Sequence, residues 1–319
     1  MVRRLGQLVV TYWAFLTILF ALFRLMPGDP TSIYGRNLPP DAREEMIDKM
    51  GLNDPLHIQY VDYMKQLVID FSWGQSHIYR EPVVNIVTIK FWNTIFLMIA
   101  ALLIAYVVGI AFGVLMAWYR GGNFEIAGIL LSLVARSIPV FFFGILLLMV
   151  FSFQLDLFPA GRMHPMTYNP ETFWDRYLTW HFVYHAILPV FTGAFVYMGT
   201  PMLLMRNSML EVLNADFIST KRAEGLSEFN IMFRHAARNS ALPIVTVFAI
   251  VMGTAIGGQV LIEVVFNWPG MGRAMVEAVQ SNDYPLAQAL FFLMGSVVIF
   301  MNLLADITYA YLDPRVTYD

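Results

Sequence analysis

A charged side chain inside a long apolar stretch is the first feature of this sequence that could carry chemistry. Arg136 lies deepest, within the apolar stretch 126–153, and Ser137-Ile138-Pro139 follow it. If the stretch crosses a membrane, an arginine at its centre costs about 2.5–3.5 kcal/mol on insertion scales, which makes it a functional candidate. Two roles stay open for Arg136: a place on a translocation path, or a structural role in which the guanidinium snorkels or binds a free carbonyl. The structural role is favoured.

A pair of histidines offers a second possible chemistry. His181 and His185 are four residues apart, a spacing that suits two ligands of one metal ion on one face of a helix. No carboxylate stands between them as in a zinc protease, and Trp180, Phe182 and Tyr184 surround them. An aromatic belt at a membrane surface is the favoured interpretation, so we expect no metal site and no cofactor.

Motifs for ATP hydrolysis and for other catalysis are absent. A P-loop needs Gly-x4-Gly-Lys-Ser/Thr, and neither Lys49, Lys65, Lys90 nor Lys221 stands in that setting. The sequence also lacks His-Glu-x-x-His, a nucleophile elbow and paired carboxylates within one apolar stretch. Since cysteine is absent, disulfides, iron–sulfur centres and thiolate zinc sites are excluded. We expect no catalytic residues and no enzyme activity of the chain's own.

The composition indicates which elements must position these residues. The 319 residues are 58% hydrophobic and 13% charged, against about 45–50% apolar and about 25% charged residues in a soluble domain. Backbone polar groups within a bilayer must be satisfied inside the chain, so continuous apolar runs imply helices. A net charge of -3 argues against a nucleic-acid partner. The sequence therefore predicts an all-α integral membrane protein in contact with membrane lipid.

Six apolar stretches are long enough to cross a hydrocarbon core of about 30 Å as helices. They are 5–26, 92–118, 126–153, 182–205, 242–266 and 286–311. Arg3-Arg4 and the basic residues of the connection 206–240 favour a cytoplasmic N-terminus. An even number of spans returns the chain to the same side. We expect six transmembrane helices in a cell membrane, with both termini cytoplasmic.

The chain then divides into three predicted parts. Residues 1–26 form a first membrane anchor, residues 27–91 an extracytoplasmic domain, and residues 92–319 a core of five helices. Within the outer domain, residues 41–50 have a helical pattern that the following glycine could end. A second outer segment, 154–181, is rich in aromatic residues and proline, and we expect it to be irregular or partly helical.

The cytoplasmic connection 206–240 is too long for a simple turn. Apolar residues recur in it near helical spacing among charges, which predicts short amphipathic helices interrupted at Gly225. An apolar ridge exposed to the cytoplasm needs a partner's groove or a membrane surface. The residue pattern alone favours neither the partner's groove nor the membrane surface.

Two strings in this connection are more specific. Residues 213–227 read LNADFISTKRAEGLS and residues 234–243 read RHAARNSALP. They resemble the signature loop of permeases of binding-protein-dependent ABC importers, in the branch that carries dipeptides, oligopeptides and nickel. The resemblance covers most of the chain and includes RLMPGDP at 24–30 and GQVLIEVVFNWPGMG at 258–272. Residues 219–221 depart from the Glu-Ala-Ala of the wider family, which disfavours its sugar and amino-acid branches.

In that family the loop forms a coupling helix that sits in a groove of the cytoplasmic ATPase and transmits its movement to the membrane helices. Gly225 would allow the chain to reverse after this helix, and Ala223 would let a partner approach closely. The resemblance implies ATPase-coupling contacts at Asp216, Phe217, Thr220, Ala223, Glu224 and Gly225.

The resemblance also implies the partners of the chain. These are a second homologous permease subunit, two cytoplasmic ATPase subunits and an extracytoplasmic substrate-binding protein. The chain would supply half of a translocation pore for di- or oligopeptides, while nickel complexes and oligosaccharides stay open as cargo. A self-contained secondary transporter is disfavoured, because the acidic residues lie in loops or at the ends of spans.

Overall fold

The computed structural model describes residues 2–25, 41, 53–76 and 78–312 of the chain. In this part the chain is helical apart from turns, loops and one isolated bridge between Gln75 and Pro82, which confirms the all-α class. The predicted helix at 41–50 lies almost wholly outside the described residues. The chain divides into two compact units, residues 1–93 with 270–299 and residues 94–269 with 300–319.

Four of the described helices are long and apolar enough to cross a membrane, and two bent helix pairs raise the number to as many as six. The apolar composition of the predicted spans therefore does produce helices of membrane-spanning length. The four candidates that are single helices are Gly6–Leu25, Val83–Trp118, Trp180–Leu213 and Tyr284–Ile307.

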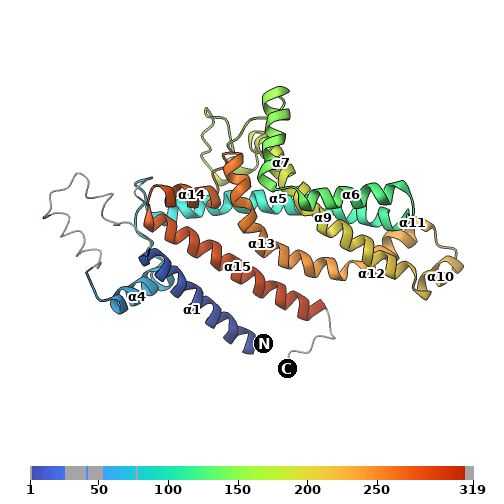
Figure 1. Cartoon of the computed structure of the whole chain (residues 1–319), viewed down its shortest axis with the longest axis horizontal. Coiled ribbons are helices and arrows are strands. Elements are labelled where there is room, and N and C mark those ends of the chain that lie inside the picture. Colours follow the sequence, from blue (N-terminus) through green and yellow to red (C-terminus); the bar gives the residue numbers. More distant parts are fainter. Residues whose placement is uncertain (1, 26–40, 42–52, 77, 313–319) are drawn as a thin grey trace. The chain divides into compact units, whose positions relative to one another are not determined.

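The first unit is built on aromatic packing between its N-terminal helix and the start of the last helix. The Tyr12 hydroxyl lies 2.9 Å from the Ser296 hydroxyl, and a Cβ added to Gly295 would collide with the ring of Phe15. This close approach is the reason a glycine is needed at position 295. The elements of this unit, seen in Figure 1, are α1 (Val2–Leu25), α4 (Leu56–Met64), the π-helical turn η1 (Lys65–Ile69), the start of α5 (Val83–Trp118), α14 (Met271–Gln280) and the start of α15 (Tyr284–Leu312).

A buried carboxylate ties the loop before α5 to the turn between α14 and α15 within this unit. Asp283 is 0% exposed, and its Oδ2 accepts hydrogen bonds from the Ser76 hydroxyl at 2.5 Å and from the backbone N–H of Ile78 at 3.1 Å. The Ser76 hydroxyl oxygen in turn accepts from the N–H of Tyr79 at 3.1 Å. Buried polar groups are thus paired where the chain has no regular secondary structure.

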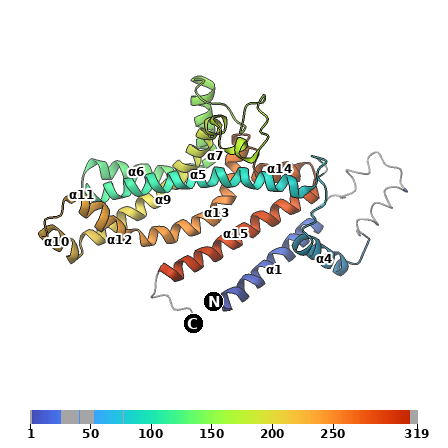
Figure 2. The ribbon, with the colours of Figure 1, turned by 180° about the vertical axis from the view of Figure 1, so that it is seen from behind.

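The second unit holds the remaining helices. Figure 2 shows them from behind, with α10 and α11 gathered at the end of α9 that is remote from α7. The elements of this unit are the remainder of α5, α6 (Asn123–Ser137), α7 (Val140–Leu147), the π-helical turn η2 (Leu148–Gln154), α8 (Phe173–Tyr177), α9 (Trp180–Leu213), α10 (Asp216–Ala223), α11 (Glu228–Asn230), the π-helical turn η3 (Ile231–Ala237), α12 (Arg238–Ser240), α13 (Leu242–Val265) and the end of α15.

Close contacts at glycines give the directions of these helices. A Cβ on Gly109 of α5 would lie 2.9 Å from the carbonyl oxygen of Met198 in α9, and one on Gly113 would lie 2.5 Å from that of Met202. Positions thus rise together along both chains, so α5 and α9 run parallel. By the same reasoning α13 runs antiparallel to α9, since its Ile262 approaches Gly193 while its Ala255 approaches Tyr197.

The predicted third span, residues 126–153, is not one continuous helix. α6 and the α7–η2 helix meet at 104°, and Figure 1 shows α7 turning away from α6. Pro139 lacks a backbone N–H and forces the preceding residue out of the helical region. Ile138 accordingly has φ -75° and ψ 129°. The stretch predicted as the third span is therefore a bent pair of helices, because the proline governs the local backbone.

The other predicted boundaries differ mainly at the ends. α5 starts at Val83, before the predicted 92, and α9 continues to Leu213, past the predicted 205. α13 begins at Leu242 as predicted, at a 53° bend from the helical segment before it. α14 has no counterpart among the predictions, because its short amphipathic pattern falls below the length that a span requires.

Candidate functional site

The predicted coupling connection, residues 206–240, is helical over most of its length. Its first part belongs to α9, which runs without a break from Trp180 to Leu213. The side-chain amide of Asn214 donates to the carbonyl oxygen of Leu210 at 2.9 Å and closes the helix end. Any displacement of α10 is therefore applied to the end of one continuous helix of 34 residues.

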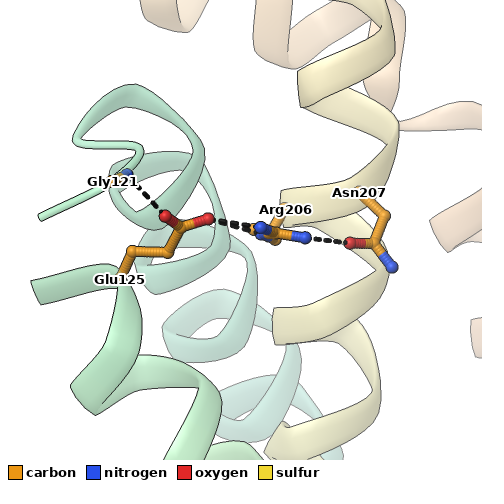
Figure 3. Close-up of polar contacts among 4 residues, drawn as sticks. All are labelled: Gly121, Glu125, Arg206 and Asn207. Atoms are coloured by element: carbon orange, nitrogen blue, oxygen red, sulfur yellow. Dashed lines mark hydrogen bonds and ion pairs between the residues drawn. The ribbon is translucent and has the colours of Figure 1, made fainter.

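An ion pair fixes α9 to α6 at the start of this segment. The Nε of Arg206 donates to Oε1 of Glu125 at 2.9 Å, and its terminal nitrogen also contacts this oxygen. The other oxygen of Glu125 accepts from the N–H of Gly121 at 2.6 Å, in the turn between α5 and α6. Figure 3 shows both oxygens engaged, with Asn207 accepting a further hydrogen bond from Arg206 at 2.8 Å.

This pair is well shielded on the acidic side, since the side chain of Glu125 is 8% exposed and that of Arg206 is 24% exposed. A charged hydrogen bond of this kind is stronger than a neutral one. Losing one partner would leave the other charge buried and uncompensated. The pair thus joins three pieces of chain, α6, the turn before it and α9, into one rigid corner.

α10 forms a helix of 8 residues because its charges suit both ends. Asp216 stands in the first turn and Lys221 and Arg222 in the last, which matches the helix dipole. Lys221 pairs with Glu224 at 2.7 Å, and Arg222 reaches Glu228 at 3.2 Å across the turn that follows. The ion pair from Arg222 to Glu228 fixes the direction in which the chain leaves α10.

Gly225 reverses the chain after α10, as the sequence predicts. Its φ is +78°, in the left-handed region that favours glycine, and a Cβ there would meet no atom within 4 Å. The N–H of Leu226 bonds the carbonyl oxygen of Lys221 and closes the helix end. The requirement for glycine is therefore one of backbone conformation and not of space.

The six residues implied as ATPase contacts all lie on the accessible surface of α10 and the turn after it. Asp216, Thr220 and Ala223 follow each other at spacings of four and three and share one face of the helix. Phe217 is 38% exposed, whereas Ile218 is 1% exposed. The other two contacts, Glu224 and Gly225, are exposed as well.

The predicted apolar ridge is thus divided. Ile218 is buried, α10 packs against η3, and Ile231 of η3 is 0% exposed. Phe217 stays open to a partner. A sequence pattern could not separate these two neighbouring apolar residues, because only the packing against η3 decides which one is covered.

The segment after Gly225 leads directly into α13. Ser227 caps α11 by accepting from the N–H of Asn230 at 3.4 Å, and η3 and α12 continue to Ser240. Pro243 stands at the start of α13, where its missing N–H costs little. A movement of α10 would therefore reach α9 on one side and α13 on the other.

Arg136 lies in the last turn of α6, where a cation suits the helix dipole. Its side chain is exposed, and its methylene groups lie against Gly199 of α9. A Cβ on Gly199 would stand 2.8 Å from Cγ of Arg136 and 2.7 Å from the carbonyl oxygen of Ser132. These contacts give Arg136 a packing role, while a role on a translocation path stays a prediction.

The two histidines predicted to lie in an aromatic belt contact the segment 154–181 of this unit. Nδ1 of His185 lies 3.2 Å from the carbonyl oxygens of Gly161 and Arg162, and the ring of His181 lies 5.2 Å from that of Tyr168. In the part of the chain that the structure describes, no three His, Cys, Asp or Glu side chains are grouped as ligands of a metal ion.

The pairing of Glu125 with Arg206 was missed by the sequence predictions. Each residue could be noticed as a charge near the end of an apolar stretch on the predicted cytoplasmic side. Their partnership could not, because 81 residues separate them along the chain.

Comparison with known proteins bears on the whole chain. Residues 109–318 match the family model described as binding-protein-dependent transport system inner membrane component, and residues 1–98 match the model of the N-terminal part of such components. The chain is 35% identical to the di/tripeptide transport system permease protein of Pseudomonas aeruginosa (strain UCBPP-PA14), with 99% of this chain and 98% of that protein covered.

Two further relatives have a similar sequence identity to this chain. The oligopeptide transport system permease protein of Bacillus subtilis (strain 168) is 36% identical, over 95% of this chain and 94% of its own length. The dipeptide transport system permease protein of Escherichia coli (strain K12) is 34% identical, over 99% of this chain and 98% of its own length.

Proposed function

Because the chain belongs to the family of binding-protein-dependent transport system inner membrane components, we propose that it is the membrane permease subunit of an ATP-driven importer of di- or oligopeptides. It would form half of the translocation pore and receive its cargo from an external binding protein. The names of three relatives, which concern di/tripeptides, oligopeptides and dipeptides, support this cargo.

The observation that carries the mechanism is the exposed face of α10 at the end of a braced helix. Asp216, Thr220 and Ala223 point to one side, and Gly225 ends the helix with a left-handed turn. The ion pair between Glu125 and Arg206 holds α9 to α6 behind it. We propose that these α10 residues, with Phe217 and Glu224, contact a cytoplasmic ATPase subunit and pass its movement into α9 and α13.

The proposed topology has six membrane spans with both termini in the cytoplasm. It counts α1, α5, the bent α6–α7 pair, α9, α13 and α15 as the spans. The parallel course of α5 and α9 and the antiparallel course of α13 support an alternation of direction. Residues 27–91 would then be extracytoplasmic and contribute to the dock for the binding protein.

Energy and the second half of the pore would come from other subunits. The sequence has no P-loop, so we propose that two cytoplasmic ATPase subunits hydrolyse ATP and that a second homologous permease completes the pore. Membrane lipid covers the rest of the helices. The exposed apolar side chains on α6 and α7, among them Leu130, Leu133 and Phe142, support both kinds of contact.

In a decisive experiment, the chain is expressed with an affinity tag, and the subunits that co-purify with it in mild detergent are identified. The complex is then reconstituted in vesicles with its binding protein, ATP and a labelled tripeptide. We expect ATP-dependent uptake of the peptide. Uptake of nickel complexes or oligosaccharides in place of peptides would correct the cargo, and transport by this chain alone, driven by an ion gradient, would overturn the proposal.

A further inference from the structure

Gln259 is a buried carboxamide without a partner in the interior of the second unit. It lies in α13 and is 0% exposed. Neither its Oε1 nor its Nε2 makes a hydrogen bond to a residue that the structure describes. Enclosing both atoms without partners costs free energy, so such a group in a folded chain needs an explanation. A bound molecule or a second arrangement of the helices would supply one.

Three helices meet at the level of this amide. A Cβ added to Gly193 of α9 would lie 3.0 Å from Cβ of Ala101 in α5 and 3.3 Å from Cδ1 of Ile262 in α13. Ala101 is 0% exposed and Ile262 is 1% exposed. Because Ile262 is three residues from Gln259, both lie on the same side of α13. The amide therefore sits where α5, α9 and α13 converge.

A second polar group, from α9, contacts the preceding turn of α13. The Tyr197 hydroxyl of α9 donates to the carbonyl oxygen of Ala255 at 3.4 Å, which is longer than the usual range of about 2.5–3.0 Å for a hydroxyl donor. Ala255 is one turn before Gln259, and a helical side chain leans toward the preceding turn. The Tyr197 hydroxyl therefore contacts the turn of α13 that precedes Gln259.

A third polar group continues the line along α13. The ring of Tyr106 in α5 packs on Phe248 with 4.7 Å between centroids. Its hydroxyl is buried and has no hydrogen-bond partner in the described part of the chain. Residues 248, 255 and 259 fall on one face of a helix, over about 16 Å of its axis. An extended tripeptide spans about 10 Å.

These groups match the main chain of a peptide. A carboxamide and two phenols can each donate and accept a hydrogen bond, and every peptide unit offers an N–H and a C=O whatever its side chain. We propose that Gln259, with Tyr197 and Tyr106, forms a binding site for the main chain of the cargo, enclosed here and uncovered when α13 moves against α5 and α9. The proposal rests on the proposed function as a peptide importer.

The chain provides a route for that movement. α13 starts at a 53° bend after α12, and α12 follows the segment that contains α10 and η3. Neutral polar side chains also suit a path through which a peptide must pass, because a pore must bind its cargo weakly enough to release it. Gln259 would then contact peptides of varied sequence only while the pore is open.

The test compares Gln259→Leu with wild type in vesicles that hold the complete importer. The probes are tri-alanine and its analogue with a methylated central nitrogen, both delivered by the same binding protein. We expect uptake of tri-alanine to fall about tenfold, which equals 1.4 kcal/mol, and the preference for tri-alanine over the analogue to shrink.

Thr192→Val is the matched control, because Thr192 is 1% exposed but its hydroxyl already bonds the carbonyl oxygen of Leu188 at 2.8 Å. It should leave uptake unchanged. If Gln259→Leu fails to assemble, Gln259→Met takes its place. If either variant of Gln259 keeps the wild-type rate of uptake and melts at the same or a higher temperature, the amide of Gln259 does not bind the cargo. That result would overturn this inference but not the proposed function. Wild-type vesicles that import no peptide would overturn the proposed function as well.

Discussion

Arg206 of α9 and Glu125 of α6 form a shielded ion pair that joins segments 81 residues apart, next to the start of the coupling connection. Both oxygens of Glu125 are used, one by Arg206 and one by the N–H of Gly121. Figure 3 shows Arg206 reaching from α9 to Glu125 of α6, and α9 continues beyond Arg206 to Leu213, shortly before α10.

Removing one member of this pair should weaken the corner more than removing both. Arg206→Met leaves the carboxylate of Glu125 buried and unpaired, and we expect a loss of about 3 kcal/mol in stability. The double variant with Glu125→Gln should recover part of the loss, since no charge is then stranded. Thermal unfolding in detergent measures both, and equal melting temperatures for the single and double variants would contradict the expectation.

The same single variant should also separate ATP hydrolysis from uptake in the reconstituted importer, because α9 would lose its ion pair to α6 near the segment that leads to α10. The partly buried pair of Arg273 with Glu277 in α14 provides the control, because it lies outside the connection 206–240. Arg273→Met removes this ion pair and leaves the pair of Glu125 with Arg206 in place. It should leave the coupling ratio at the wild-type value.

Gly225→Val should uncouple transport from ATP hydrolysis while the chain still inserts in the membrane. No atom lies within 4 Å of a Cβ at this position, so the expected effect comes from the φ of +78° alone. A non-glycine residue in the left-handed region costs about 1–2 kcal/mol. Gly225→Asn is the control, because asparagine tolerates this conformation. The measurement is the ratio of peptide taken up to ATP hydrolysed. Equal ratios in Gly225→Val and Gly225→Asn would contradict the prediction.

Arg136→Met should leave uptake within about twofold of wild type, because the methylene groups that lie against Gly199 are kept. Gly199→Val should be much more harmful, since its new side chain would press on Arg136 and on the backbone of Ser132. Uptake and melting temperature are measured for each, with Arg136→Lys beside them. Uptake that is lost in Arg136→Met but kept in Arg136→Lys would place the charge on the translocation path.

The segment 155–179, which contains His164, should loosen in mild acid. Burial, together with the nearby charges of His185, Arg176 and His181, lowers the pKa of His164 to about 4, against an opposing interaction with the backbone of Arg176. The unfolded imidazole has a pKa of about 6.5, so the unfolded segment binds the proton first. Stability is complete above about pH 6.5 and is lost as the pH falls toward about 4.

Hydrogen exchange of residues 155–179 at pH 7 and pH 5, corrected for intrinsic rates, checks this expectation. Exchange should rise in acid in the wild type. In His164→Phe the rise should be smaller, because no proton can be taken up at that position. An identical rise in both proteins would assign the pH dependence to another group.

Local features of the fold could be predicted from neighbouring residues. The apolar stretches predicted helices of membrane-spanning length, Gly225 predicted the reversal after α10, and the strings at 213–227 and 234–243 predicted the family. Each of these depends on composition, spacing or the backbone of one residue. The bend within residues 126–153 has a local cause as well, because Pro139 is visible in the sequence, although the size of the bend is not.

Pairings between distant segments required the tertiary structure. The sequence by itself determined a helical membrane chain and the family to which it belongs. Only the packing of helices decided that Glu125 meets Arg206, that Ile218 is covered while Phe217 is open, and that the amide of Gln259 is enclosed without a partner. The reason is physical: helical periodicity is set within a few residues, whereas the neighbours of a side chain depend on which helices approach and at what register.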